Sequence, residues 1–448
     1  MTLTPASVQN SLFISRYFLA PLLFIAGCAT PPPPIIVAAP ACPVCEVCQV
    51  CPAPSALMPI ITEPPATPTE TPRGRLERAA WDALPGFAAE NPADALGAFL
   101  QSCGVLKAKI EWQQVCSRAV ALPPNAKAQT VNQFFRDNFD PFRVINADET
   151  ETGLVTGYYE PLLRGSRVRT AEFKYPVYGA PQDLITVDLS EVYPDLKFRR
   201  LRGRLVGNKL VPYMERRQIA ADGTPLGGLE LAYVDNAVEL FFLEIQGSGQ
   251  ILLPDGSRMR VGYSDQNGHP FRSLGGLLIR RGEIKPERAS MQGIKEWARR
   301  NPAKVQQFMN ANPSFVFFKE LPGDLSGPIG TLGVPLTAER SIAVDQRVIP
   351  LGVPVYLSTT FPNTRQELNR LMVAQDTGGA INGAVRADFY WGFGDEAGAQ
   401  AGRMKQQGRM WVLLPRGYDP NLPHLPHLPH LPNLMSPLNA PATKQSPQ

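Results

Sequence analysis

The sequence predicts a mainly β fold with helices near the start of its folded part, and three observations support this. From residue 153 onward, short segments rich in β-branched and aromatic residues recur. Gly, Pro, Asp and Asn separate these segments, and helical patterning is clear in only four places. Many short strands joined by such turns favour barrels over a doubly wound parallel sheet.

The first residues read as an export signal rather than as part of the fold. Arg16 precedes an apolar run at residues 17–26, which is too short to span a membrane and is typical of a signal peptide ending at residue 27. Ile25-Ala26-Gly27-Cys28 has the form of a bacterial lipobox, which predicts lipidation of Cys28. The alternative is an ordinary cleaved signal peptide with Cys28 as a bystander. Since Ala29 rather than Asp follows, we expect a lipid-anchored protein on the periplasmic face of the outer membrane.

Residues 28–74 are rich in Pro, Ala, Val and Thr and predict a semi-extended tether. A C-x-x-C-x-x-C-x-x-C run lies within it, formed by Cys42, Cys45, Cys48 and Cys51. This spacing is compatible with a metal or iron-sulfur site. Export to an oxidising compartment favours disulfides within or between tethers instead, so we expect no metal.

The other end of the chain, residues 418–448, is also of low complexity and predicts a disordered tail. It repeats Leu-Pro-His, and proline at every third residue is incompatible with helix or sheet. His424, His427 and His430 could bind metal loosely, and His269 is the only other histidine. A multi-histidine metal shell is therefore excluded from the folded part, and a Ser-His-Asp triad there would have to use His269. The net charge of +4 does not indicate a surface that binds nucleic acid.

Between these ends, the pattern predicts individual elements in chain order. Helices are expected at residues 75–84, 93–106, 130–138 and 290–301. Strands are expected at residues 153–163, 237–245, 250–253, 258–263 and 347–357. Pro254-Asp255-Gly256 indicates a hairpin turn between two of these strands. Cys103 and Cys116 could form a disulfide within the helical region.

Two aspartates, Asp376 and Asp388, are the strongest candidates for catalysis. A stretch with three glycines separates them, and Phe389, Tyr390 and Trp391 follow directly. Apolar surroundings and a second carboxylate raise a carboxyl pKa, which a general acid needs, and aromatic rings can pack against sugars. The alternative is that both aspartates cap turns in a glycine-rich hairpin.

Asp376-Thr377-Gly378 also matches the tripeptide of aspartic proteases. One copy would require a homodimer, and this chain is far longer than such protomers. Gln375 also stands where an apolar residue is expected. We therefore do not favour a protease.

The region around the two aspartates resembles the catalytic barrel of the membrane-bound lytic murein transglycosylase A family, with Asp-Thr-Gly-Gly-Ala-Ile-x-Gly followed by an Asp and an aromatic. Further blocks resemble the family in the same order, so that the resemblance covers nearly all of residues 75–415. They are residues 154–162, 242–249, 267–273, 312–319 and 340–350.

The resemblance implies a double-psi β-barrel with an inserted second β domain. The barrel would comprise residues 75–165 and 290–417, and the insertion residues 166–289. The catalytic residue would be Asp388, with Asp376 supporting the site. Residues expected to line a glycan groove are Tyr158, Tyr159, Glu160, Gln246, Ser248, Thr377, Gly378, Gly379 and Tyr390. For the two tyrosines from residues 158–159, packing in the barrel core is the alternative.

The family implies cleavage of the β-1,4 bond between N-acetylmuramic acid and N-acetylglucosamine in peptidoglycan, with 1,6-anhydromuramic acid ends and no cofactor. Asp388 would act first as general acid and then as base. Two alternatives are a glycan hydrolase that uses Asp376 and Asp388 together, and a lipoprotein that binds murein without cleaving it. Expected partners are glycan strands, the membrane through Cys28, and possible proteins of the cell-wall machinery.

Overall fold

The computed structural model describes residues 73–221 and 225–420. The predicted signal peptide, Cys28, the four tether cysteines and the Leu-Pro-His repeats lie outside the described residues. Within the described part, none of the helices combines the length and apolar character needed to cross a membrane.

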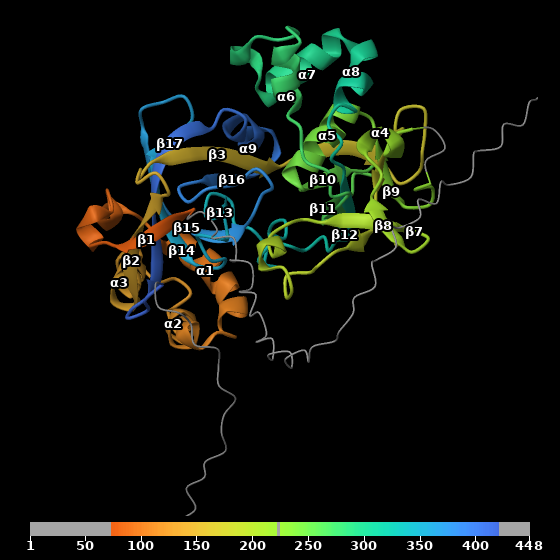
Figure 1. The fold of residues 1–448 in the computed structure, drawn as a ribbon. Coiled ribbons are helices and arrows are strands. Elements are labelled where there is room, and N and C mark those ends of the chain that lie inside the picture. The colour runs from red at the N-terminus through yellow and green to blue at the C-terminus, as the bar shows by residue number, and fades with distance from the viewer. Residues whose placement is uncertain (1–72, 222–224, 421–448) are drawn as a thin grey trace, which may run out of the picture. The chain divides into compact units, whose positions relative to one another are not determined.

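Eight strands form one sheet (Figure 1), in which the last strand in the order returns to pair with an inner one. They are β1 (Gly74–Arg78), β2 (Phe139–Asn146), β3 (Gly153–Glu160), β13 (Ser341–Val344), β14 (Pro354–Thr360), β15 (Glu367–Asp376), β16 (Ala387–Phe393) and β17 (Lys405–Pro415). Their order is β1-β2-β17-β14-β15-β13-β16-β3, and β17 also pairs with β3. Six strands, from β17 round to β3, therefore close into a barrel. The neighbours β13 and β15 are parallel, as are β3 and β16, whereas the other neighbours in the ring are antiparallel.

Large side chains fill the barrel and account for much of its stability. Tyr356, Phe389 and Trp411 are among the largest fully buried residues of the described chain. Burying an apolar side chain of this kind is worth about 1.5–3 kcal/mol relative to leaving it exposed. These residues alternate along their strands with residues that face the other way, as a strand requires.

Three helices pack beside β2 and β15: α1 (Ala93–Leu106), α2 (Ile110–Val120) and α3 (Ala128–Asn138). The sequence of α3 shows why it is a helix, because its buried residues Val131, Phe134 and Phe135 lie on one face at helical spacing. A disulfide between Cys103 and Cys116 joins α1 to α2. The sequence left this pairing open, and the structure contains the bond.

A second sheet has the order β12-β11-β10-β4-β9-β5. Its strands are β4 (Leu162–Ser166), β5 (Tyr175–Tyr178), β9 (Glu230–Val234), β10 (Ser248–Leu252), β11 (Arg258–Gln266) and β12 (Val316–Leu321). A small sheet holds β6 (Ile185–Thr186), β7 (Arg202–Val206) and β8 (Lys209–Pro212). Because β12 pairs with β11, the second sheet extends past residue 289, where the insertion was expected to end. The domain limits themselves stay a prediction.

The remaining helices support these sheets. Helix α5 (Ala237–Gln246) packs on the second sheet, α9 (Gly394–Ala401) packs on β3 and β16, and α4 (Arg216–Ile219) is a single turn. Helices α6 (Leu274–Arg280), α7 (Met291–Arg300) and α8 (Pro302–Met309) lie together in Figure 1 around the buried Trp297. Four 3-10 turns complete the described elements: η1 (Trp81–Ala83), η2 (Phe87–Ala89), η3 (Pro194–Leu196) and η4 (Pro286–Arg288).

Most element predictions are confirmed. The expected helix at residues 93–106 is α1, that at 130–138 lies within α3, and that at 290–301 contains α7. The expected strands at residues 153–163, 250–253 and 258–263 correspond to β3 with the start of β4, to β10 and to β11. The turn at residues 254–256 joins β10 to β11 as predicted, with Gly256 at φ +83°.

Three predictions are wrong. Residues 75–84 do not form a helix, because β1 instead pairs along the whole length of its segment with β2. Residues 237–245 form α5 rather than a strand, since the Asn236 side chain caps the helix by accepting from the backbone N–H of Val238 and Glu239. The strand expected at residues 347–357 begins only at Pro354, because the preceding residues form a turn around Asp345, whose backbone carbonyl accepts from the N–H of Val348.

Candidate active site

The two candidate aspartates lie on the two strands that flank β13. Ala343 of β13 pairs with Asp388 of β16 on one side and with Asp376 at the end of β15 on the other. Neighbouring strands lie about 4.8 Å apart, so the two backbones are separated by about 10 Å. The order of the strands thus brings Asp376 and Asp388, which are twelve positions apart in the sequence, to the same site.

The Asp388 carboxyl group has one oxygen fixed and one oxygen available. Thr156 of β3 lies directly opposite in the parallel register and donates its hydroxyl to Asp388 Oδ1 at 2.6 Å. Arg386 Nη2 in turn donates to Thr156 Oγ1 at 2.9 Å, which leaves the Thr156 proton directed at Asp388. Within residues 73–221 and 225–420, no hydrogen bond engages Asp388 Oδ2. The side chain is only partly buried, so this oxygen can meet a ligand.

The surroundings of Asp388 favour its protonated form. Desolvation raises the pKa of Asp388 from 3.8 to about 6, and the negative charge of Asp376 adds to this rise. The hydrogen bond from Thr156 and the positive charge of Arg386 oppose the rise without cancelling it. Asp388 therefore carries a proton for a substantial fraction of the time near pH 6, as a general acid requires.

Both oxygens of the Asp376 carboxyl group, in contrast, accept hydrogen bonds from the protein. Its Oδ1 accepts from the Thr331 N–H at 2.9 Å, the Thr331 hydroxyl at 2.8 Å and the Thr377 N–H at 2.9 Å. Its Oδ2 accepts from the Tyr158 hydroxyl at 3.1 Å. Burial raises the pKa of Asp376, and the hydrogen bonds from Thr331, Thr377 and Tyr158 oppose that rise. These bonds tie Asp376 to the loop at Thr331 and to Tyr158 of β3.

Tyr158 donates its hydroxyl to Asp376, and Tyr390, which is only 3% exposed, packs beside the Tyr158 ring. Their ring centroids lie 5.2 Å apart. Burial raises the pKa of Tyr158 well above its usual range, and the negative charges of Asp376 and Asp388 raise it further. Tyr158 therefore stays a proton donor. Phe389 and Trp391, which alternate with Asp388 and Tyr390 along β16, are instead buried in the hydrophobic core, where Trp391 donates to the Met404 sulfur.

Tyr159 and Gln246 lie away from the aspartates, where β3 leaves the barrel. The Tyr159 side chain is only 5% exposed and packs against α9, where a Cβ added at Gly398 would come within 2.7 Å of its ring. Gln246 Oε1 accepts from the Tyr159 backbone N–H at 3.0 Å. This geometry matches the alternative of core packing for Tyr159, and its role in binding substrate stays a prediction.

Glu160 is the last residue of β3, and Ser248 is the first residue of β10 in the second sheet. Glu160 is 1% exposed, with Oε1 3.2 Å from Arg260 Nε and Oε2 accepting from Gln250 Nε2. Ser248 is partly buried at the first position of β10. The Glu160 contacts link β3 to the second sheet, and contact of either residue with substrate stays a prediction.

In the glycine-containing loop after Asp376, the Ile381 side chain packs closely against the backbone at Gly378. A Cβ added at Gly378 would lie 2.7 Å from the Ile381 side chain, so only glycine fits that position without a shift. Thr377 Oγ1 lies 2.9 Å from Thr331 Oγ1, and the Gly379 carbonyl accepts from the Asn382 amide. Gly379 is exposed and leaves the loop backbone accessible beside the aspartates.

Comparison with known proteins decides the family. Residues 154–319 match the family model described as "MltA specific insert domain", and residues 340–414 match the "3D domain". Membrane-bound lytic murein transglycosylase A of Escherichia coli is 36% identical over 281 residues, which cover 61% of this chain and 69% of that protein. The chain belongs to the membrane-bound lytic murein transglycosylase A family.

Solved structures of this family agree. MltA from Neisseria gonorrhoeae is 39% identical with a TM-score of 0.67, and the match covers 77% of this chain and 93% of that chain. LtgG, a lytic transglycosylase of Burkholderia pseudomallei, is 46% identical with a TM-score of 0.54 over 76% and 96% of the two chains. The predicted fold class is confirmed: the chain is mainly β, with the family's double-psi β-barrel and an inserted domain.

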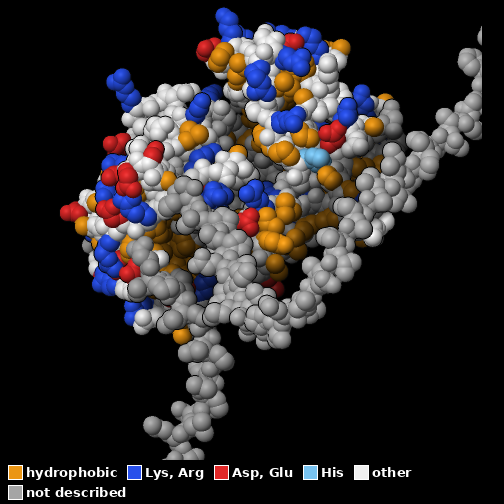
Figure 2. All heavy atoms as spheres, in the orientation of Figure 1, with side chains coloured by type: hydrophobic (Ala, Val, Ile, Leu, Met, Phe, Trp, Pro, Cys, Tyr) orange, Lys and Arg blue, Asp and Glu red, His pale blue; other side chains and the backbone are white. Residues whose placement is uncertain are grey.

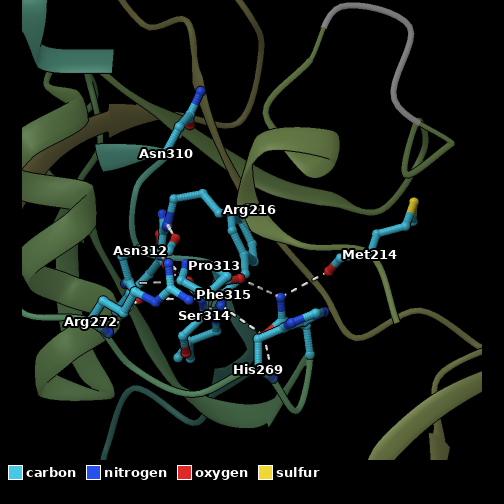
Figure 3. Close-up of polar contacts among 12 residues, drawn as sticks. Met214, Arg216, His269, Arg272, Asn310, Asn312, Pro313, Ser314 and Phe315 are labelled. Atoms are coloured by element: carbon cyan, nitrogen blue, oxygen red, sulfur yellow. Dashed lines mark hydrogen bonds and ion pairs between the residues drawn. The ribbon is translucent and has the colours of Figure 1, made fainter. Parts of the chain in front are cut away.

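Two of the family blocks outside the aspartate motif meet in a buried polar network (Figure 3). Asn267 Nδ2 donates to the carbonyls of Met214 and Pro313, and Asn267 Oδ1 accepts from the Phe315 N–H. His269 Nε2 lies 2.7 Å from the Tyr213 carbonyl oxygen. These contacts tie the blocks at residues 267–273 and 312–319 to each other, so these blocks stabilise the insert.

Basic side chains on the face shown in Figure 2 form several separate groups, with acidic and hydrophobic side chains among them. The sequence also lacks a continuous basic tract. That the protein has no nucleic-acid-binding surface stays a prediction.

Sequence reasoning missed three residues that hold the aspartates: Thr156, Thr331 and Arg386. Thr156 lies in the family block at residues 154–162, and Arg386 lies in the aspartate motif. Both could therefore have been identified from the sequence. Thr331 lies in an irregular segment with no signal of its own, and only the fold brings it to Asp376.

Proposed function

We propose that the protein is a peptidoglycan lytic transglycosylase that uses Asp388 as its single acid and base. The difference between the two aspartates supports this most directly. Asp388 has a raised pKa and an oxygen without a partner among the described residues, whereas both oxygens of Asp376 accept hydrogen bonds from the protein. A hydrolase would need a second carboxylate free to activate water.

In the proposed reaction, protonated Asp388 gives its proton to the oxygen that links N-acetylmuramic acid to N-acetylglucosamine. The bond from that oxygen to muramyl C1 breaks, and the muramyl C6 hydroxyl oxygen attacks C1. The Asp388 carboxylate accepts the proton of that hydroxyl, which restores the acid for the next cycle. The product ends in 1,6-anhydromuramic acid, and the intramolecular attack benefits from high effective molarity.

The glycan would bind beside Asp388, against residues that the structure places near the two aspartates. Tyr158, Thr377, Gly378, Gly379 and Tyr390 are proposed to contact sugars. The E. coli MltA structure with bound chitohexaose, at 29% identity and a TM-score of 0.54, shows that a relative holds a β-1,4 glycan. This supports a glycan as the substrate class here.

The first test is mass spectrometry of glycan strands digested by the protein and by its Asp388→Asn variant. Products lighter by one water than hydrolysed ones, lost in the variant, are expected. The Asp324→Asn variant, which changes an exposed aspartate in the segment between β12 and β13, is the matched control and should cleave normally. Reducing ends would indicate hydrolysis with Asp376 as base. Absence of cleavage by a folded sample would leave a murein-binding lipoprotein.

Asp376→Asn separates the two roles further. If Asp376 holds loops, an amide still accepts hydrogen bonds on its oxygen, so the variant should keep measurable cleavage. Asp388→Asn should lose several orders of magnitude, because the amide cannot donate the proton. Equal losses in the two variants would contradict the assignment of a single acid and base.

We also propose attachment to the outer membrane, on its periplasmic face, through lipid on Cys28. The lipobox supports this, and the relatives in E. coli and Vibrio cholerae are named membrane-bound. Labelled palmitate should be incorporated by the wild type and lost in a Cys28→Ala variant. Persistent labelling of that variant would refute lipidation at Cys28.

A further inference from the structure

The second sheet and its helices enclose a cavity that the proposed reaction does not use. Its volume is about 390 Å³, within the range of small-ligand sites. Strands β5 and β9 and helices α4, α5 and α8 surround it. Apolar residues provide part of its lining, with Ile219, Leu240, Met309 and Phe315 among them.

The buried ion pair in the cavity wall is already satisfied and is not available to a ligand. Arg216 Nη1 and Nη2 donate to the two oxygens of Glu244, at 2.8 and 2.5 Å. Arg216 also donates to the backbone carbonyls of Asn312 and Ser314, as Figure 3 shows in part. Its guanidinium lies over the rings of Phe241 and Phe315. This pair therefore holds the wall in place and adds no net charge.

Two other cations that line the cavity are not paired. Arg169 and Lys174 are exposed, and neither forms an ion pair with any described residue. The Lys174 ammonium lies 5.4 Å from the centroid of the Tyr175 ring, which forms part of the same lining. Glu230 is the one other carboxylate of the lining as described, and it accepts from the Gly228 N–H at 2.7 Å. The described lining therefore carries a net positive charge.

Tyr178 supplies a hydroxyl donor that the protein leaves unused. The residue is 6% exposed and lines the cavity, yet its hydroxyl has no hydrogen-bond partner within residues 73–221 and 225–420. Burial raises the pKa of Tyr178 to about 12, so the hydroxyl keeps its proton at neutral pH. The hydroxyl is not one of the buried polar atoms that lack a partner, so it is open to the cavity, where a ligand oxygen can accept from it.

We propose that this cavity binds an acidic peptide, with carboxylates at Arg169 and Lys174 and a further oxygen at the Tyr178 hydroxyl. The apolar lining fits short aliphatic side chains, and Glu230 can accept from a peptide amino group. Murein carries acidic peptides on its muramic acid residues, so the stem peptide of the glycan substrate is the occupant we assign. That identity rests on the proposed function, whereas the preference for an acidic peptide rests on the cavity alone.

Helix α5 connects the cavity to the junction beside the barrel. Leu240 and Glu244 line the cavity, and Gln246 at the end of the helix accepts from the Tyr159 N–H on β3. At 1.5 Å per residue, Leu240 and Gln246 are separated by about 9 Å along the helix. Helix α5 thus runs from the cavity to the strand that carries Thr156 and Tyr158.

The test uses calorimetric titration of the full-length protein in detergent with the tripeptide L-Ala-γ-D-Glu-meso-diaminopimelate. We expect measurable binding that Arg169→Gln with Lys174→Gln weakens by about tenfold or more. Tyr178→Phe should weaken binding by a smaller factor without loss of thermal stability, since its hydroxyl has no partner to lose. Arg281→Gln with Lys285→Gln, two exposed cations outside the cavity, is the control and should bind normally.

Two further ligands separate this proposal from simpler ones. The same tripeptide with its carboxyl groups amidated should not bind, and inorganic phosphate should not displace the tripeptide. Equal binding by the amidated peptide or by phosphate would overturn the assignment of an acidic peptide, as would unchanged binding in the cavity variants. Loss of glycan cleavage in Asp388→Asn with tripeptide binding kept would show that the two proposals stand separately.

Discussion

Replacing Asp388 by asparagine should make the protein more stable while it removes activity. Desolvation raises the pKa of Asp388 from 3.8 to about 6, which means that folding disfavours the ionised carboxylate. Each pKa unit corresponds to about 1.4 kcal/mol, so at pH values above 6 the ionised side chain costs about 3 kcal/mol of stability. An amide of the same shape avoids this cost and still accepts the hydrogen bond from Thr156.

The sign of the pH dependence follows from proton binding. Between pH 3.8 and about 6, the native state holds the Asp388 proton more often than the unfolded state does. The contribution of Asp388 to the free energy of unfolding therefore falls as the pH rises through this window and stays constant above it. Below the window, both states are protonated and the difference between wild type and variant should vanish.

Urea unfolding of the wild type and the Asp388→Asn variant, measured across this range of pH, tests the argument. The free energies of unfolding should agree below pH about 4 and differ by about 3 kcal/mol above pH about 6, with the variant the more stable. Asp324→Asn serves as control and should show no such growing difference. A difference that is independent of pH, or a variant less stable than wild type at pH 7, would refute the assignment of a raised pKa to Asp388.

Three other predictions follow from the same structure. The rate of anhydro product formation should fall about tenfold per pH unit above about 6, as Asp388 loses its proton, and a profile that stays flat to pH 8 would contradict this. Glu244→Gln should reduce the free energy of unfolding by about 3–5 kcal/mol, because it leaves the Arg216 charge buried without its partner. The double variant Glu244→Gln with Arg216→Met should recover much of that loss in the same unfolding experiment. Reducing the disulfide between Cys103 and Cys116, or replacing both cysteines by serine, should cost about 3 kcal/mol by thermal unfolding, and an unchanged transition would show that the bond contributes little.

Composition and short-range patterning determined much about this protein without any structure. The compact motif from Asp376 to Tyr390 identified the catalytic candidates, because glycines and aromatics around two aspartates are uncommon. The hairpin at Pro254-Asp255-Gly256 could be predicted because turn chemistry is local. Helix α1 could be predicted for the same reason, since its apolar residues follow helical spacing without reference to distant partners.

Other features were decided only by tertiary structure. The segment at residues 237–245 has strand composition, yet burial of one face against the second sheet and the Asn236 cap make it a helix. Closure of the barrel brings Thr156 to Asp388 from a strand more than two hundred residues earlier, and loop packing brings Thr331 to Asp376.

The distinction between acid and support also depended on the fold. In the sequence, the aromatics that follow Asp388 and the family resemblance favour Asp388 as the acid, but the hydrogen-bond donors around each carboxyl group cannot be identified there. A carboxyl pKa is set by desolvation and by the donors that surround the group, and those donors come from strands and loops far apart in the chain. The sequence therefore identified the two candidate carboxylic acids, and the tertiary structure supplied the burial and the hydrogen-bond donors that distinguish them.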